Sequence, residues 1–206
     1  MNIKTEIIQK IKKIVGDTNI ITSDWNKQPF CKGWRYGEGD ALAVVKPGNL
    51  IEFWKTLEVC VEKDLIIIMQ AANTGLTGGS TPYGNDYDRL IILINTTRID
   101  DIHIIDNGKQ IIGFAGSTLY KLEKKLEPFE REPHSVIGST SIGASIIGGV
   151  CNNSGGSLVK RGPAYTELSL YAKINKNGKL ELINELGIKL GSNVEEILNN
   201  LQNRNY

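Results

Sequence analysis

The chain has 206 residues, with 24 Lys plus Arg against 23 Asp plus Glu, which gives a formal net charge of +1 at pH 7. This balance argues against a nucleic-acid-binding protein, because a basic excess is needed to neutralise several phosphates. Hydrophobic residues make up 40% of the chain and charged residues 23%, so the composition indicates a globular protein. The unusual feature is the number of glycines, which is 22.

We expect neither a membrane-spanning helix nor a signal peptide in this sequence. No apolar run approaches the ~18 positions that a membrane-spanning helix needs. The lysine-rich N-terminal segment lacks the apolar stretch of a signal peptide, so we do not expect export. Cys31, Cys60 and Cys151 are odd in number and widely spaced, which favours reduced thiols over a disulfide framework.

The first half of the chain predicts a small parallel α/β lobe, because helical spacing of apolar residues alternates with short β-branched runs. The expected helices cover residues 3–15 and about 50–63, and the expected strands cover 41–45, 65–69 and 90–94. Gly16 ends the first helix, and Asn49 with Glu52 makes a capping box for the second. The strand, helix, strand order predicts that the first two strands are parallel and buried.

The second half predicts antiparallel pairing. The expected hairpins pair 102–105 with 110–114 and 168–174 with 179–183, and the expected helices cover 117–126 and a segment after 192. Ser117 and Ser192 are the expected N-caps. His103 alternates with isoleucines in its strand, and we expect it to face solvent. The polar segment 201–206 is expected to be a loose end.

Half of the glycines lie in two segments, four in residues 75–84 and seven in residues 138–162. The first segment leaves the carboxyl end of the strand over 65–69, where ligands bind in open α/β sheets. Its small and hydroxyl-bearing residues let backbone N–H groups approach an anion. A flexible connector is the alternative interpretation.

Two common phosphate motifs are excluded. Gly138 and Gly143 have the glycine spacing of a Walker A loop, but Ala144 stands where the phosphate-binding lysine is required. No GxGxxG motif opens a helix, so Rossmann dinucleotide binding has no support. Two glycine-rich segments, one in each half, indicate a long ligand that lies between the halves and contacts mainly backbone.

Three stretches carry a family resemblance: GDALAVVKPGNL, MQAANTGLTGGSTPYGNDYDR and REPHSVIGSTSIGASIIGGVCNNSGGSLVKRGPAYTE. They closely resemble the quinone-dependent D-lactate dehydrogenases of bacterial respiration, which are vanillyl-alcohol-oxidase-like flavoproteins. The resemblance covers about residues 20–200. It implies an α+β fold class, a two-lobed FAD-binding domain with a small parallel α/β lobe over 1–95 and an incomplete antiparallel α+β lobe over 96–206.

The resemblance also implies which residues hold FAD. The implied cofactor-binding residues are Ala71, Ala72, Asn73, Thr74, Gly75, Gly79 and Ser80 in the first glycine segment, and Gly138, Ser145 and Gly155 in the second. Some relatives attach the flavin through His or Cys, and the first segment contains neither, so we expect noncovalent FAD. No residue is assigned as catalytic or as a metal ligand.

The implied reaction oxidises D-lactate to pyruvate and passes electrons through FAD to quinone. Oxidising a 2-hydroxy acid needs a base near its hydroxyl and a cation at its carboxylate, and neither is assigned here. The family's substrate cap and membrane-association region lie C-terminal to this part, so the fragment alone is not expected to turn over. In the full-length family the enzyme is cytoplasmic and peripheral at the inner face of the cell membrane. The alternative is a non-catalytic remnant or the FAD-binding module of a related 2-hydroxy-acid flavoprotein.

A few single residues invite a functional interpretation. For His134, beside the second glycine segment, we favour a structural or hydrogen-bonding role over that of a general base. Cys151 is expected to be a buried thiol rather than a redox partner. Candidates to cover the adenine or a domain edge are Trp25, Trp34 and Tyr36.

Overall fold

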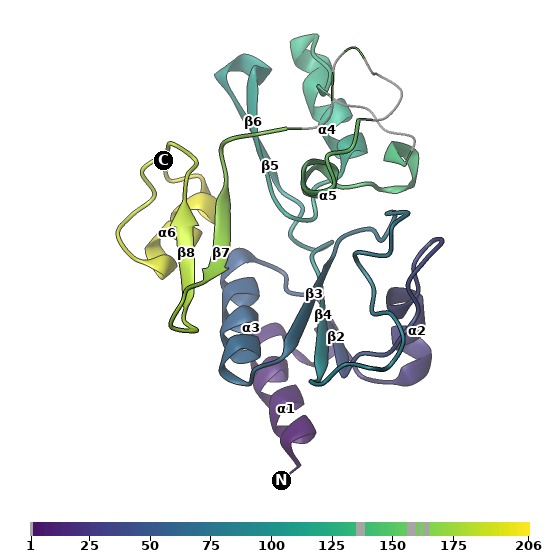
Figure 1. Cartoon of the computed structure of the whole chain (residues 1–206). Coiled ribbons are helices and arrows are strands. Elements are labelled where there is room, and N and C mark those ends of the chain that lie inside the picture. The colour runs from purple at the N-terminus through teal and green to yellow at the C-terminus, as the bar shows by residue number, and fades with distance from the viewer. Residues whose placement is uncertain (1, 135–138, 156–159, 161, 163–164) are drawn as a thin grey trace.

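The computed structural model describes residues 2–134, 139–155, 160, 162 and 165–206 (Figure 1). The first half forms α1 (Ile3–Val15), β1 (Ile20–Ile21), α2 (Asp24–Cys31), β2 (Ala43–Val45), α3 (Leu50–Glu62), β3 (Ile66–Gln70) and β4 (Ile91–Asn95). The second half forms β5 (Ile102–Ile105), β6 (Gln110–Gly113), α4 (Leu119–Leu126), α5 (Ile146–Cys151), β7 (Leu170–Ile174), β8 (Leu180–Asn184) and α6 (Val194–Asn203).

A four-stranded sheet with the order β1-β2-β4-β3 organises the first half. The strands β2, β4 and β3 are parallel, and β1 pairs antiparallel with β2 at the edge. The strand, helix, strand unit is confirmed, and β4 lies between its two strands. All five residues of β4 are buried, because β4 has a neighbour on each side and is covered on both faces.

The expectation that the strand over 65–69 is buried is wrong. The strand β3 is the edge strand of the sheet, and most of its residues are only half-buried. Met69 is 41% exposed. An edge strand has one neighbour, so its outer side stays open to solvent.

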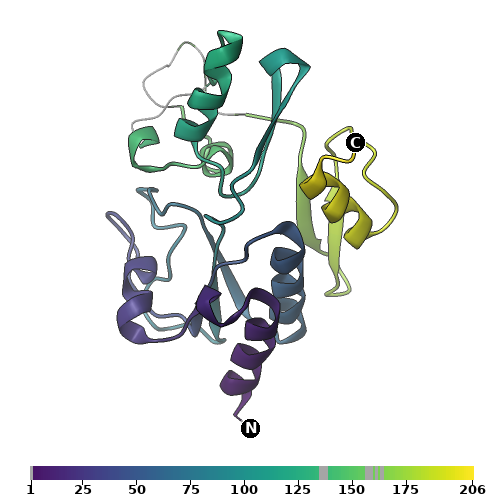
Figure 2. The ribbon, with the colours of Figure 1, turned by 180° about the vertical axis from the view of Figure 1, so that it is seen from behind.

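Helices cover both faces of this sheet. On one face, Ile7 and Ile11 of α1 and Cys60 of α3 pack against Val45 and Ile92. Figure 2 shows α1 in purple beside α3 in blue on this side of the sheet. On the other face, α2 contributes Cys31, which packs with the alternate residues of β2 and β4. The amphipathic patterns of α1 and α3 thus produce the core that the sequence predicts.

Both expected hairpins form, as β5 with β6 and as β7 with β8. The β5–β6 hairpin lies with α4 and α5 beyond one end of the parallel sheet, whereas β7, β8 and α6 lie beside α3 (Figure 1). In one apolar cluster, Leu50 and Phe53 of α3 pack with Leu190 and Leu201. Packing therefore crosses the expected lobe boundary between residues 95 and 96, and that boundary stays a prediction.

Two helix caps differ from the expected ones by one residue. Thr118 caps α4, because its hydroxyl accepts a hydrogen bond from the N–H of Lys121, while the buried Ser117 hydroxyl donates to the carbonyl of Phe114. Asn193 caps α6 by accepting from the N–H of Glu196. At both helix starts two adjacent residues are good N-caps, and the sequence alone does not show which of the two caps the helix.

His103 is buried, so the expectation that it faces solvent is wrong. Its side chain is 2% exposed and lies 5.0 Å from the ring of Phe114, centroid to centroid. The Nδ1 atom lies 2.7 Å from the hydroxyl of Tyr206, and Nε2 has no hydrogen-bond partner in the described part of the chain. The segment 201–206 is therefore packed against the hairpin rather than loose.

Burial of this imidazole makes stability depend on pH. Burial, followed by the charge of Arg204, lowers the pKa of His103 in the folded protein. The unfolded chain then binds the proton more readily, so the stability from neutral His103 is complete above the unfolded pKa of about 6.5 and is lost progressively below it. We expect the melting temperature to fall between pH 7.5 and 5.5, and His103→Phe to reduce that fall. The variant His134→Gln, at an exposed histidine, should keep the wild-type dependence; equal pH dependence in His103→Phe and wild type would contradict this assignment.

Candidate functional site

The first glycine segment begins at the end of β3, beside the end of the parallel strand β4. Gln70 is the last residue of β3 and lies opposite Asn95, the last residue of β4. The carboxyl ends of parallel strands are where ligands bind in open α/β sheets. The structure therefore places residues 71–80 where the sequence predicts a binding loop.

Backbone N–H groups in this loop are free to bind a ligand. Within the described residues, no backbone N–H of residues 72–80 donates a hydrogen bond to another protein group. All of these residues are exposed or half-buried, so water or a ligand can reach them. Backbone N–H groups carry partial positive charge, and a loop that presents several of them attracts an anion without a cationic side chain.

Two glycines of the loop have no explanation in the protein's own packing. A Cβ atom built on Gly75 or Gly79 meets no atom within 4 Å, and neither residue has the positive φ that favours glycine. The fold would accept a side chain at both positions. Glycine at these positions is explained if a ligand occupies the open space and approaches the backbone closely.

The segment that follows α2 supports the loop from one side. Asn73 adopts a positive φ of 54°, its Nδ2 donates to the carbonyl of Lys32 at 2.8 Å, and its Oδ1 accepts from the hydroxyl of Ser80 at 2.8 Å. Gly37 lies so close to Thr81 that a Cβ atom at position 37 would overlap the threonine hydroxyl. The sequence analysis missed this support, although the glycines at 33, 37 and 39 are a signal for close backbone packing.

The helix α2, which the sequence analysis also missed, is tied to the sheet by a buried cation. Lys27 is 4% exposed, and its Nζ lies 2.9 Å from Asp40 Oδ1 and 3.1 Å from Asp24 Oδ1. Burial opposes the charge of Lys27, but the hydrogen bonds to Asp40 and Asp24 outweigh burial and raise its pKa. Lys27 also donates to the carbonyl of Ala41, just before β2. Its charge thus stays paired, and the end of α2 is fixed beside the loop.

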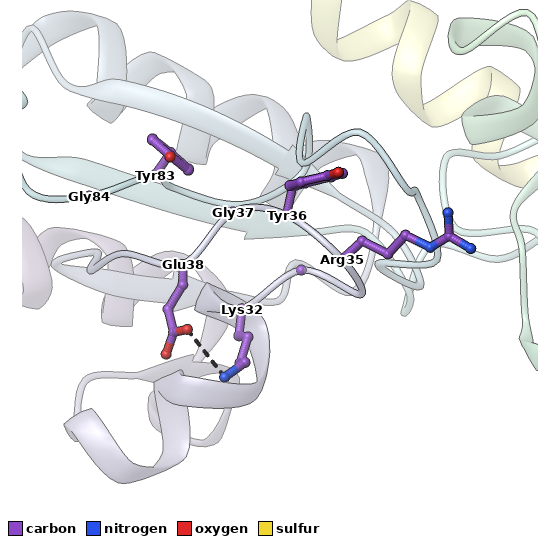
Figure 3. Close-up of a pocket in the computed structure, with 8 residues that line it drawn as sticks. Lys32, Arg35, Tyr36, Gly37, Glu38, Tyr83 and Gly84 are labelled. Carbon is purple, nitrogen blue, oxygen red and sulfur yellow. Dashed lines mark ion pairs between the residues drawn. The ribbon is translucent and has the colours of Figure 1, made fainter.

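A shallow hollow of about 430 Å³ lies next to this support (Figure 3). It is lined by Lys32, Gly33, Arg35, Tyr36, Gly37, Glu38, Tyr83 and Gly84. Lys32 and Glu38 point toward each other and form an ion pair at 3.2 Å, while Arg35 extends away from them. None of the residues implied to hold FAD lines this hollow, so it is distinct from the loop. Tyr36 and Trp34 are exposed, and their expected cover of the adenine stays a prediction.

The second glycine segment comes close to the first. A Cβ atom on Gly143 would lie 3.6 Å from Cβ of Ala72, so the two segments are neighbours. The N–H groups of Gly143 and Ala144 donate to Thr140 and Ser139, in a closed turn. This segment therefore has fewer free donors than the loop over 72–80, a difference that the composition of the two segments does not reveal.

Ser145 is buried and caps the short helix α5 by accepting from the N–H of Gly148 at 3.0 Å. Its hydroxyl oxygen therefore serves the fold, and a role toward FAD stays a prediction. Gly155 is half-buried beyond α5, and Gly138 lies outside the described residues.

The remaining candidate residues form no reactive cluster. His134 is exposed. Cys151 is exposed, so its expected burial is wrong. Cys60 is buried under α3, and burial raises the pKa of its thiol to about 12, which keeps it protonated and unreactive at neutral pH. Across the described ranges, no three His, Cys, Asp or Glu side chains gather in a way that could hold a metal ion.

The comparisons with known sequences find an FAD-binding family and several curated relatives. Residues 41–181 match the model of a family described as FAD binding domain. The chain is 60% identical over 201 residues to the quinone-dependent D-lactate dehydrogenase of Haemophilus influenzae, covering 98% of this chain and 36% of that enzyme. It is 57% identical over 194 residues to the enzyme of that name from Escherichia coli, covering 94% of this chain and 34% of that enzyme. The chain thus spans about a third of the length of these curated relatives.

Solved structures match the fold at low sequence identity. An alkyldihydroxyacetonephosphate synthase superposes with a TM-score of 0.72 at 14% identity, covering 94% of this chain and 37% of that one. A p-cresol methylhydroxylase superposes with a TM-score of 0.69 at 16% identity, covering 96% of this chain and 38% of that one. These likenesses confirm the expected α+β fold of the vanillyl-alcohol-oxidase type.

The loop assignment predicts that Gly75→Val strongly weakens flavin binding without unfolding the chain. A Cβ atom at this position meets no protein atom within 4 Å, and the valine methyl groups would occupy the space beside the free N–H groups. Loss of one hydrogen bond to a charged group costs about 1.5–3 kcal/mol, so FAD affinity should fall about tenfold or more. Flavin absorbance per folded chain measures the loss, and circular dichroism checks the fold. Lys10→Ala, which removes the ion pair between Lys10 of α1 and Glu62 of α3, should retain flavin; wild-type flavin content in Gly75→Val would contradict the assignment.

Proposed function

Because the chain belongs to the FAD binding domain family, we propose that its loop over residues 71–80 holds the pyrophosphate of a noncovalently bound FAD. The observation that carries this proposal is the row of backbone N–H groups over 72–80 that have no partner among the described residues. The open space at Gly75 and Gly79 lets a phosphate approach that backbone. Backbone donors also fit a chain of near-zero net charge, because they bind an anion without lysine.

The larger function that we propose is that of the FAD-binding part of a respiratory D-lactate dehydrogenase. Its reaction would oxidise D-lactate to pyruvate and pass the electrons through FAD to quinone. The identity to enzymes named quinone-dependent D-lactate dehydrogenase is 52–60%, against 25–30% to enzymes named D-2-hydroxyglutarate dehydrogenase. Bound FAD would supply the acceptor for the two electrons of the substrate. The identity difference favours D-lactate over other 2-hydroxy acids.

The proposal assigns binding to this chain and leaves catalysis to residues outside it. Oxidation of a 2-hydroxy acid needs a base at the hydroxyl and a cation at the carboxylate. Among the described residues, His103 is buried against Tyr206 and His134 is exposed and distant in sequence from the loop. Neither histidine is therefore proposed as the base, and the isolated chain is expected to bind FAD without turnover.

Membrane association belongs to the same proposal. No helix in the described residues is long and apolar enough to cross a membrane. We propose that the full-length enzyme is cytoplasmic and contacts the inner face of the cell membrane peripherally. This contact would use regions of the longer relatives that this chain does not cover.

The second candidate function is a non-catalytic FAD-binding module, either a remnant or a module of a related 2-hydroxy-acid flavoprotein. The observations that favour it are the FAD binding domain match over residues 41–181 and the 25–30% identity to enzymes named D-2-hydroxyglutarate dehydrogenase. Both candidates bind FAD, and they differ in whether a longer or second polypeptide completes the site.

Flavin binding by the purified chain is the first test of the proposal. We expect yellow protein with the flavin absorbance bands, and we expect acid precipitation to release the colour into the supernatant, because the first glycine segment offers no His or Cys for a covalent bond. Colour that stays with the precipitate would contradict noncovalent binding. Colourless protein that takes up no added FAD would contradict the binding proposal itself.

Turnover is the second test. With FAD bound, the 206-residue chain should not reduce an electron-accepting dye when D-lactate is added, because it lacks an assigned base and carboxylate-binding cation. Dye reduction with D-lactate at a rate above that of free FAD would contradict our placement of the catalytic groups outside this chain. L-lactate serves as the control substrate for the same measurement.

A further inference from the structure

We propose that Gln70 and Asn95 are positioning residues for FAD, because their paired side-chain amides fix the two ends of the pyrophosphate loop at a set distance from each other. The inference rests on the proposed function, since it assumes that the loop holds FAD. Neither side chain is among the residues implied by the family resemblance. Both act through the loop backbone and neither is proposed to touch the cofactor.

Gln70 joins the start of the loop to its end. Its side-chain Nε2 donates to the carbonyl of Ser80, at the end of the loop, at 2.9 Å. The same nitrogen donates to the carbonyl of Phe30 in α2, also at 2.9 Å. One amide group therefore fixes the far end of the loop and the neighbouring helix to the end of β3.

Asn95 completes the connection from the adjacent strand. Its Nδ2 donates to Oε1 of Gln70 at 3.2 Å and to the carbonyl of Ala71 at 3.0 Å. Its Oδ1 accepts from the backbone N–H of Thr97 at 3.3 Å and from the hydroxyl of Thr97 at 2.5 Å. Asn95 thus holds the first residue of the loop while it orients the Gln70 amide.

The network is buried and complete, which makes it sensitive to small chemical changes. Gln70 and Asn95 are each 3% exposed. Every polar side-chain atom of the pair has a hydrogen-bond partner, and none of those partners is ionisable. A buried network of this kind specifies one geometry when it is satisfied and is costly when one donor is removed.

The free N–H groups of the loop explain why such an anchor matters for binding. No backbone N–H of residues 72–80 donates a hydrogen bond within the described protein, so few backbone bonds hold the loop in shape. Its shape depends on its anchored ends, on the side-chain bonds of Asn73, and on Thr81, whose N–H and hydroxyl both donate to the carbonyl of Gly78 at 3.4 Å. If the ends are released, the loop must be ordered when FAD binds, and that ordering weakens affinity.

The test uses Gln70→Glu, which keeps the size of the side chain and removes its two N–H donors. At pH 8 the carboxylate places negative charge against the carbonyls of Phe30 and Ser80. At lower pH the carboxylate takes up a proton, which burial favours, and regains one donor. We expect FAD to bind the variant about tenfold or more weakly at pH 8 and the deficit relative to wild type to shrink toward pH 5.5.

The matched control is Gln110→Glu, the same substitution at an exposed position of β6. Its FAD affinity should follow that of wild type at both pH values. Affinity is measured by quenching of flavin fluorescence at each pH, and circular dichroism gives the folded fraction by which each affinity is corrected. A role in folding alone would leave the corrected affinity of Gln70→Glu equal to that of wild type, and this result would overturn the inference.

A second variant covers the case in which Gln70→Glu does not fold. Asn95→Asp keeps the acceptor for Thr97 and removes the donor to Gln70 and Ala71, so it should show the same deficit at pH 8 and the same recovery at pH 5.5. A folded Asn95→Asp with wild-type affinity, or a deficit that does not recover with pH in either variant, would overturn the inference. Absence of FAD binding by wild type would instead overturn the proposed function and the inference with it.

Discussion

Backbone N–H groups that have no protein partner must be satisfied by water or by a ligand, and residues 72–80 present a consecutive row of them to solvent within the described structure. The neighbouring elements hold this loop in place. Side chains of the adjacent strands β3 and β4 bond both ends of the loop, Gln70 to Ser80 and Asn95 to Ala71, and the segment after α2 bonds Asn73. The loop therefore keeps its backbone N–H donors free while its ends are held by hydrogen bonds. A loop of this kind binds an anion with little reorganisation.

The strand order explains why the loop lies at an accessible place. The central strand β4 is buried along its whole length, so it holds the sheet together and fixes Asn95. The edge strand β3 is half-buried, and the loop that leaves it has no further strand beside it. A loop after a central strand would have strands on both sides, whereas the described neighbours of this loop beyond its anchored ends include Gly143 and the segment over 32–38.

Elements with strong local patterns could be predicted from the sequence. The isoleucines of α1, the Asn49 cap of α3 and the asparagine-glycine turns of the two hairpins are local signals, and each of these elements forms. The position of the binding loop followed from the strand before it and from its glycines. The family resemblance added the identity of the ligand, which spacing and composition leave open.

What could not be predicted depends on contacts between distant residues. His103 alternates with isoleucines as a solvent-facing residue would, but Phe114 and Tyr206 cover it. The helix α2 contains Pro29 and a buried lysine, so its sequence lacks an amphipathic pattern, and it is held by Asp40 instead. The link between Gln70 and Asn95 joins residues 25 positions apart, and no local spacing indicates it.

The central claim is that backbone amides of the loop bind the pyrophosphate of FAD, and competition between nucleotides tests it most directly. ADP carries the pyrophosphate and the adenosine of FAD without the flavin, whereas adenosine lacks both phosphates. The account predicts that ADP displaces FAD from the 206-residue chain at concentrations where adenosine does not. Equal displacement by ADP and adenosine, or none by either while FAD is bound, would contradict it.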